Sequence, residues 1–138
     1  MAIFRLAPGP KGIMAAALIG DLDDQATPWY GEVYAGTIPA TTAVAIGAQT
    51  KLGTVTGSTD PSATQSNGLI TFNPIVEDSA ADANGEAAFM RIFKGTSNSV
   101  WADLDLGNLA SSATGKMNTT TVVAGGPIRV NSFTISVG

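Results

Sequence analysis

The clearest strand pattern in the chain is EAAFMRIFK, residues 86–94. Successive side chains of an extended strand point to opposite faces of a sheet. Phe89 and Phe93 therefore share one face, and Met90 and Ile92 share the other. Both faces are largely apolar, which is typical of a central strand or of one that a partner covers.

Strand patterns recur on both sides of this segment, from Trp29 to the end of the chain. They are short runs rich in Val, Ile, Thr and aromatic residues, separated by clusters of Gly, Pro, Asn and Ser. The pattern predicts an all-β domain, a single antiparallel β-sandwich of about seven short strands. We place strands near residues 29–35, 50–56, 68–73, 86–94, 99–106, 117–123 and 127–137, and loops at 36–49, 57–67 and 107–116.

Two Asn-Gly pairs, at residues 67–68 and 84–85, are the strongest turn signals. Asn and Gly readily adopt the positive φ angles of a two-residue turn, so each pair predicts a tight hairpin. In the last strand the apolar residues change phase at residues 131–132. This predicts a bulge, or a strand that passes from one sheet to another.

The first 28 residues differ from the rest. A helix is plausible from Gly12 to Asp24, where Ile13 and Leu18 are among the apolar residues that can share a face. Acidic residues crowd its end, where the helix dipole favours cations, so we expect it to be short or frayed.

The apolar run at residues 13–19 is short for a secretory signal and far too short for a membrane helix. Two regions are therefore predicted. Residues 1–28 form an arm or short helix that packs on a neighbour and can be removed without unfolding the rest, and residues 29–138 form the β-sandwich domain.

Composition excludes several classes of function. The chain has 138 residues, enough for one domain, and contains no Cys and no His. Thiol nucleophiles, His bases, Ser-His-Asp triads, the usual zinc sites and disulfides are therefore excluded. The net charge is -4 and the basic residues are scattered singly, which argues against nucleic acid. We expect a protein that is not an enzyme and has no cofactor, no catalytic residues and no metal.

Paired carboxylates could in principle serve a glycosidase. Asp103 and Asp105 are expected on one face of their strand, about 7 Å apart, with Trp101 on the same face. Nothing in the sequence marks either carboxylate for a raised pKa. The pattern favours an exposed polar face or a contact with a neighbouring subunit.

The most acidic stretch of the chain matches part of an EF-hand calcium loop at Asp82, Asn84 and Gly85. The match fails where Ala80 and Arg91 occupy positions that need oxygen ligands. A solvated loop is therefore favoured, and a weak calcium site between loops stays open.

Aromatic side chains cluster at residues 29–34, and an exposed patch there would suit a glycan or a protein partner. Filling of the core is the commoner explanation for such residues. The candidate partner contacts are Ile13, Leu18, Trp29, Tyr30, Tyr34 and Trp101.

Four stretches carry a resemblance: VYAGTIPAT at 33–41, GLITFN at 68–73, DANGEAAFMRIF at 82–93 and TVVAGGPIRVNSFTI at 121–135. They resemble a family of small proteins encoded among the virion structural genes of tailed bacteriophages. The resemblance covers about residues 30–137, and the closing motif with its Gly-Gly-Pro is its most specific part. The N-terminal segment departs from the family, whose members look more helical and polar there. This departure predicts a particle-specific attachment segment.

The resemblance implies a structural component of the virion, made in the bacterial host cytoplasm. We expect a capsid decoration (cement) protein that binds the major capsid protein or other virion proteins, as a homo-oligomer or symmetric array. A tail, neck, collar or fibre-base component is the first alternative. A glycan-binding β-sandwich module is the second. Neither nucleic acid nor a membrane is an expected partner.

Overall fold

The computed structural model describes residues 2–58 and 61–137, which form one helix and ten strands. The prediction of a mostly β chain is confirmed. The elements are α1 Pro8–Asp23, β1 Tyr30–Ala35, β2 Thr50–Thr56, β3 Ala63–Ser66, β4 Leu69–Phe72, β5 Gly85–Glu86, β6 Phe89–Phe93, β7 Val100–Asn108, β8 Gly115–Met117, β9 Thr121–Val122 and β10 Ser132–Ser136.

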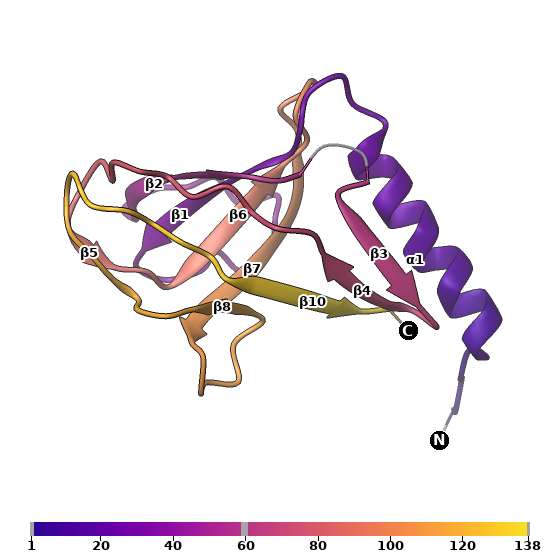
Figure 1. Ribbon diagram of the computed structural model, residues 1–138. Helices are drawn as coiled ribbons and strands as arrows, with labels where there is room; N and C mark the ends of the chain where they lie inside the picture. The colour runs from indigo at the N-terminus through magenta and orange to yellow at the C-terminus, as the bar shows by residue number, and fades with distance from the viewer. Residues whose placement is uncertain (1, 59–60, 138) are drawn as a thin grey trace.

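Eight strands form one curled sheet in the order β2-β1-β6-β7-β8-β10-β4-β3, and β5 pairs with β9 in a separate ribbon. A sandwich of seven strands is not confirmed. Neighbouring strands of the sheet are antiparallel except β7 and β8, which are parallel. Figure 1 shows the sheet extending from β1 and β2 to β3, which lies beside α1. The central strand β6 has four of its five residues buried, so the prediction that both of its faces are covered is confirmed.

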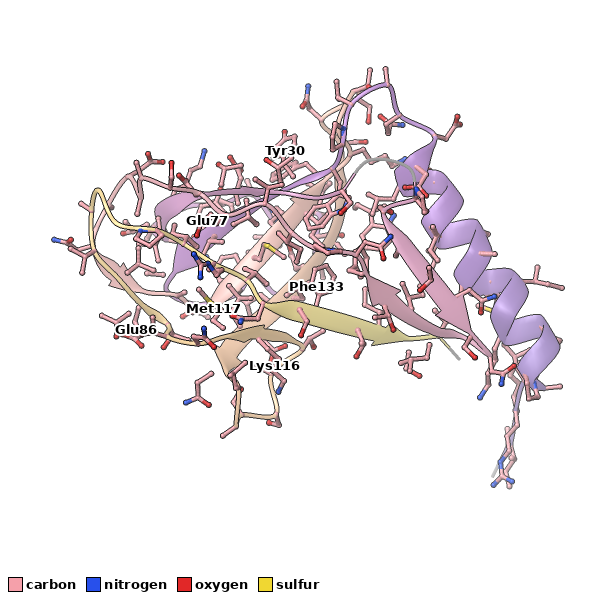
Figure 2. The ribbon with its side chains drawn as sticks, viewed as in Figure 1. Tyr30, Glu77, Glu86, Lys116, Met117 and Phe133 are labelled. Atoms are coloured by element: carbon pink, nitrogen blue, oxygen red, sulfur yellow. The ribbon has the colours of Figure 1, made fainter. Side chains whose placement is uncertain are left out.

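Two isolated bridges draw distant parts of the curled sheet together. Thr56, at the end of β2, pairs with Val76, and Asp78 pairs with Ile128, ahead of β10. The core lies inside this curl. Its largest fully buried side chains include Trp29, Leu52, Ile70, Met90, Ile92, Met117, Ile128 and Phe133. Figure 2 shows Phe133 in the middle of the molecule.

Of the two Asn-Gly pairs, only the first forms a hairpin. Asn67 and Gly68 have φ angles of 51° and 93° and join β3 to β4. At the second pair, Gly85 instead begins β5 and pairs with β9. The side-chain oxygen of Asn84 accepts a hydrogen bond from the Ala124 N–H. The hairpin predicted at residues 84–85 is therefore wrong, because distant residues satisfy both members of the pair.

Two short strands begin where loops were expected: β3 lies within residues 57–67, and β8 begins at Gly115, near the end of the loop expected at 107–116. The phase change in the last strand has a simple cause. Ile128 bridges Asp78, the Asn131 N–H then donates to the Lys116 carbonyl, and β10 begins one residue later. The chain passes at this point from an isolated bridge to the curled sheet, so the phase change marks the start of β10.

Helix α1 is longer than predicted and begins at Pro8. Proline suits the first helical turn because its φ is already helical and its missing N–H would have had no partner there. The acidic end is not frayed, because its carboxylates have partners. Asp21 pairs with Lys94 at 2.8 Å, and Asp23 accepts the Ser62 N–H at 2.9 Å.

The helix shares one core with the strands. Ala15 and Leu22 of α1 are buried in the same cluster as Phe72 and Phe133. We therefore revise the expectation that residues 1–28 can be removed without unfolding the rest. Removal of α1 is now expected to destabilise the strands. None of the helices in the described ranges is long and apolar enough to cross a membrane.

Candidate interaction surface

The middle of α1 presents an unusual surface. Residues 12–20, GIMAAALIG, contain no charged side chain, so this stretch is apolar on every side. Such helices are normally buried all round. In α1 only Ala15 of this stretch is fully buried, whereas Ile13 is 72% exposed and Leu18 is 37% exposed.

The segment that precedes the helix extends this surface. Residues 2–7 have no regular secondary structure, and Phe4 is 84% exposed. Within the described ranges, the backbone of residues 2–6 makes no hydrogen bond to the body of the protein. We use the name N-terminal apolar surface for the exposed side chains of this region: Ile3, Phe4, Ile13, Met14 and Leu18.

This surface is concentrated rather than scattered. It holds five of the eleven large apolar side chains that are exposed in the described part of the chain. Burying one such side chain contributes about 1.5–3 kcal/mol. Clustered exposure of this kind is typical of a contact site for a protein partner. Ile13 and Leu18, both predicted as partner contacts, lie on it.

The aromatic candidates lie elsewhere. Trp29 is 1% exposed and packs edge-to-face against Phe72, with ring centroids 5.8 Å apart. Tyr34 is buried and stacks on Phe89 at 5.2 Å. These two residues cannot contact a partner from the folded chain, so the expected aromatic patch is corrected and the core-filling explanation holds for them. Tyr30 is half-buried, at the periphery in Figure 2.

Burial and a hydrogen bond alter the chemistry of Tyr34. Its hydroxyl donates to Glu32 Oε1 at 2.9 Å. Burial, with this bond and the charge of Glu32, raises the pKa of Tyr34 to about 12. Glu32 in turn pairs with Lys51 at 2.7 Å. The group is a structural network on the outer face of β1 and β2.

The residues of β7 do not alternate as expected. The register between β6 and β7 shifts between Ile92 and Phe93, which turns Trp101 toward Phe72 in the core, with ring centroids 6.1 Å apart. Asp103 points the other way, toward Arg91. The prediction that Trp101 shares a face with Asp103 and Asp105 is therefore wrong, and the cause is this irregularity.

Sequence reasoning missed the role of Arg91. Its guanidinium holds Asp103 with two hydrogen bonds, of 2.7 and 2.9 Å, and also donates to the Val44 carbonyl at 2.9 Å. The pair thus ties the loop at 36–49 to the sheet. The sequence did contain a signal for this role. Arg91 lies in a strand predicted to be covered on both faces, and a buried charge needs a charged partner.

The other carboxylate of β7 also has a structural role. Asp105 accepts the Thr114 N–H at 2.9 Å, and this bond lowers the pKa of Asp105. Asp103 is held by Arg91, so the two groups do not face a common site. Within residues 2–58 and 61–137, no group of three or more acidic side chains is placed to hold a metal ion.

Comparison with known proteins found no match among protein-family models, curated proteins or solved structures. The chain's own surface and its four motifs are therefore the features that bear on its function.

Proposed function

We propose that this chain is a non-enzymatic structural protein of a tailed bacteriophage, a decoration protein that binds and stabilises the assembled head. The observation that carries the proposal is the N-terminal apolar surface, which the folded chain leaves uncovered. The four sequence motifs, which resemble a family of tailed-bacteriophage virion proteins, are the reason for proposing this class of particle. The expected partner is the major capsid protein, met at many equivalent positions.

The rest of the surface suits dense packing. Ala, Gly, Ser and Thr make up 63 of the 138 residues, and these side chains lose little entropy when they are ordered. Thr64, Thr71 and Thr134 lie opposite one another across β3, β4 and β10, and all three are exposed. Such an uncharged face can approach a neighbour without leaving a charge buried and unpaired.

A decoration protein stabilises its shell by mass action. A ligand that binds the assembled state but not the dissociated state shifts the equilibrium toward assembly, by an amount that grows with its free concentration. Docking of Ile13 and Leu18 into apolar hollows of the shell would supply this selective affinity. The end of the molecule that includes Glu77 and Glu86 in Figure 2 would then face solvent.

The direct test is the number of copies per particle. Quantitative mass spectrometry of gradient-purified particles should find about one copy or more for every six capsid subunits, because decoration follows the symmetry of the shell. A few to a few dozen copies would instead place the chain in the tail, neck, collar or fibre base. Its absence from particles would refute a virion role and return the glycan-binding module to consideration.

A second test probes the surface itself. We expect Ile13→Gln and Leu18→Gln each to weaken binding to purified heads by tenfold or more, since each removes about 1.5–3 kcal/mol of apolar burial. Val123→Gln is the matched control. Val123 is also exposed, but it directly follows β9, which pairs with β5 at the end of the molecule remote from α1 (Figure 1). Equal binding by all three variants would exclude α1 as the attachment surface.

A further inference from the structure

We propose that α1 packs antiparallel against α1 of a second copy, so that the free protein is a two-fold dimer in which Ile13 of each chain lies over Gly20 of the other. This inference goes beyond the proposed function and does not depend on it. It follows from the polarity, shape and charge of the outer side of α1, which become complementary to a second copy of the same helix when that copy is reversed.

The outer side of α1 is open to a helix from another molecule. Figure 1 shows α1 at one margin of the molecule, with β3 and β4 beside its inner side. On the outer side, Ile13, Ala16, Ala17 and Gly20 are all exposed, and none of them has a polar side chain. A helix that is apolar all round is normally covered on every side. The expected occupant is therefore apolar along about two turns of α1.

This side of the helix combines a projecting side chain with an open position. Ile13 is 72% exposed, whereas a Cβ built on Gly20 would meet no atom within 4 Å. The two residues are seven positions apart, close to two turns of about 3.6 residues, so they project from the same side. Their midpoint falls between Ala16 and Ala17, whose small side chains allow two helices to approach closely. A two-fold axis through this midpoint places each Ile13 over the Gly20 of the other chain.

The charges of α1 oppose its own dipole. The dipole favours anions in the first turn and cations in the last turn. Instead, the first turn ends in Lys11 and has no acidic residue, and the last turn contains Asp21 and Asp23 and no basic residue. Asp24 follows directly, and none of the four ion pairs in the described chain includes it. One end of α1 therefore attracts an anion and the other end attracts a cation.

A reversed second copy satisfies both ends. The same two-fold axis places Asp24 of one chain level with Gly9 of the other, in the first turn of its α1. There the carboxylate meets the positive end of the helix dipole, near which Arg5 and Lys11 also occur in the sequence. Parallel pairing would bring like charges together at both ends. Charge complementarity therefore favours a second copy, in antiparallel orientation, as the occupant.

The pair covers one flank of α1 and leaves the other free. At about 100° per residue, Leu18 projects about 150° round the helix from the line through Ile13 and Gly20. Ile13 cannot contact a second copy and a shell at once, so attachment through Ile13 would open the pair. The inference concerns the protein in solution. Its tests contain no phage heads, so its failure and the failure of the proposed function can be distinguished.

The first test is analytical ultracentrifugation of the purified full chain over a range of concentrations, where we expect a two-chain species. Gly20→Leu should weaken the pairing about tenfold or more, because the new side chain occupies the space that Ile13 of the partner needs. Where both proteins are monomeric, this change should not lower the melting temperature, since leucine favours a helix more than glycine does.

Gly47→Leu is the matched control for this variant. Gly47 is also exposed, and a Cβ there would approach no atom closer than 4.0 Å, but it lies in the loop at 36–49. This change should leave the pairing unaltered. A full chain that stays monomeric over the whole range, or equal pairing by the Gly20→Leu and Gly47→Leu variants, would overturn the proposal.

A second variant tests the charges. Asp24→Lys should weaken the pairing about threefold or more, because it brings a cation to the positive end of the partner helix. The same change suits the dipole of its own helix, so a loss of pairing would not come from a loss of folding. The effect should shrink as the salt concentration rises, because salt screens exposed charges. Equal pairing by Asp24→Lys and the unaltered chain would refute the inferred register.

Cross-linking determines the orientation. The chain has no Cys, so introduced thiols are its only ones. When the Gly9→Cys and Asp24→Cys variants are mixed, a bismaleimide should link one chain of each kind, whereas Gly9→Cys alone should give no linked product. Links between two Gly9→Cys chains would indicate a parallel pair and overturn the antiparallel arrangement.

Discussion

Arg91 and Asp103 form an ion pair whose side chains are only 4% and 8% exposed. Arg91 has apolar neighbours on both sides along its strand, so water cannot replace its partner. The carboxylate and the Val44 carbonyl satisfy its donors instead. At the scale of single residues, this pair joins β6, β7 and the loop at 36–49 into one rigid unit.

Removing one member of this ion pair should strongly destabilise the fold. We expect Asp103→Asn to lower the free energy of unfolding by about 3 kcal/mol or more, because it leaves the Arg91 charge buried without a counter-charge. Urea denaturation measures the loss. Glu77→Gln is the control, since the pair of Glu77 with Arg129 is exposed and should contribute about 1 kcal/mol or less. Similar losses in both variants would contradict the importance given to burial.

The raised pKa of Tyr34 predicts that the stability of the fold depends on pH in the alkaline range. Its pKa is raised from 10.0 to about 12 in the folded chain, so between these values the unfolded state releases a proton that the folded state retains. The free energy of unfolding should therefore be steady below about pH 10 and fall as the pH rises toward 12. Denaturation at a series of pH values tests this.

Tyr34→Phe provides the control for the pH dependence. This variant should lose less stability across the same pH range, because the titrating hydroxyl is gone. The hydrogen bond to Glu32 also raises the pKa of Lys51, which adds a second contribution at alkaline pH. That contribution remains in the Phe variant. An identical slope in the two proteins would show that Tyr34 is not the source.

The hairpin of β3 and β4 shows which elements could be predicted from sequence. Asn67-Gly68 predicts the turn correctly, because the positive φ angles depend on those two residues alone. β3 itself, with the sequence ATQS, carries no apolar alternation and was missed. It is a strand because β4 and α1 lie beside it. The short strand β8 has the same cause, since its partners β7 and β10 come from elsewhere in the chain.

The same turn gives a prediction at the scale of elements. Gly68→Ala should lower the free energy of unfolding by about 1–3 kcal/mol from its positive φ, with a further loss from contact. A Cβ there would lie 2.8 Å from the Lys11 Cβ of α1 and 3.0 Å from the Val137 carbonyl oxygen. Gly125→Ala has a similar φ of 83° but open space, so it measures the backbone effect alone. A smaller loss at Gly68 than at Gly125 would refute the close packing of α1 on this hairpin.

At the scale of the whole molecule, α1 has two roles on opposite sides. Its inner side contributes Ala15 and Leu22 to the core, and its outer side carries most of the N-terminal apolar surface. Under the proposed function, force from a bound shell would pass through α1 to the whole fold.

The two roles can be separated by truncation. A chain that begins at residue 29 should be strongly destabilised, because the loss of Leu22 alone opens a cavity of a kind that costs about 2–5 kcal/mol. A chain that lacks only residues 2–7 should unfold at nearly the same temperature as the full chain when both are monomeric, because residues 2–5 are exposed and none of residues 2–6 makes a backbone hydrogen bond within the described chain. Thermal unfolding followed by circular dichroism compares them. Equal melting temperatures for the two truncations would contradict a shared core.

The sequence by itself determines the β-rich class, the turn at Asn67-Gly68, the covered central strand and the absence of thiol and imidazole chemistry. These properties depend on residue type and on local alternation. Tertiary structure alone decides which apolar residues are buried. Ile13 and Trp29 are both strongly apolar, yet one lies at the surface and the other in the core. The reason is that burial depends on the segments that pack from far along the chain, which no local pattern encodes.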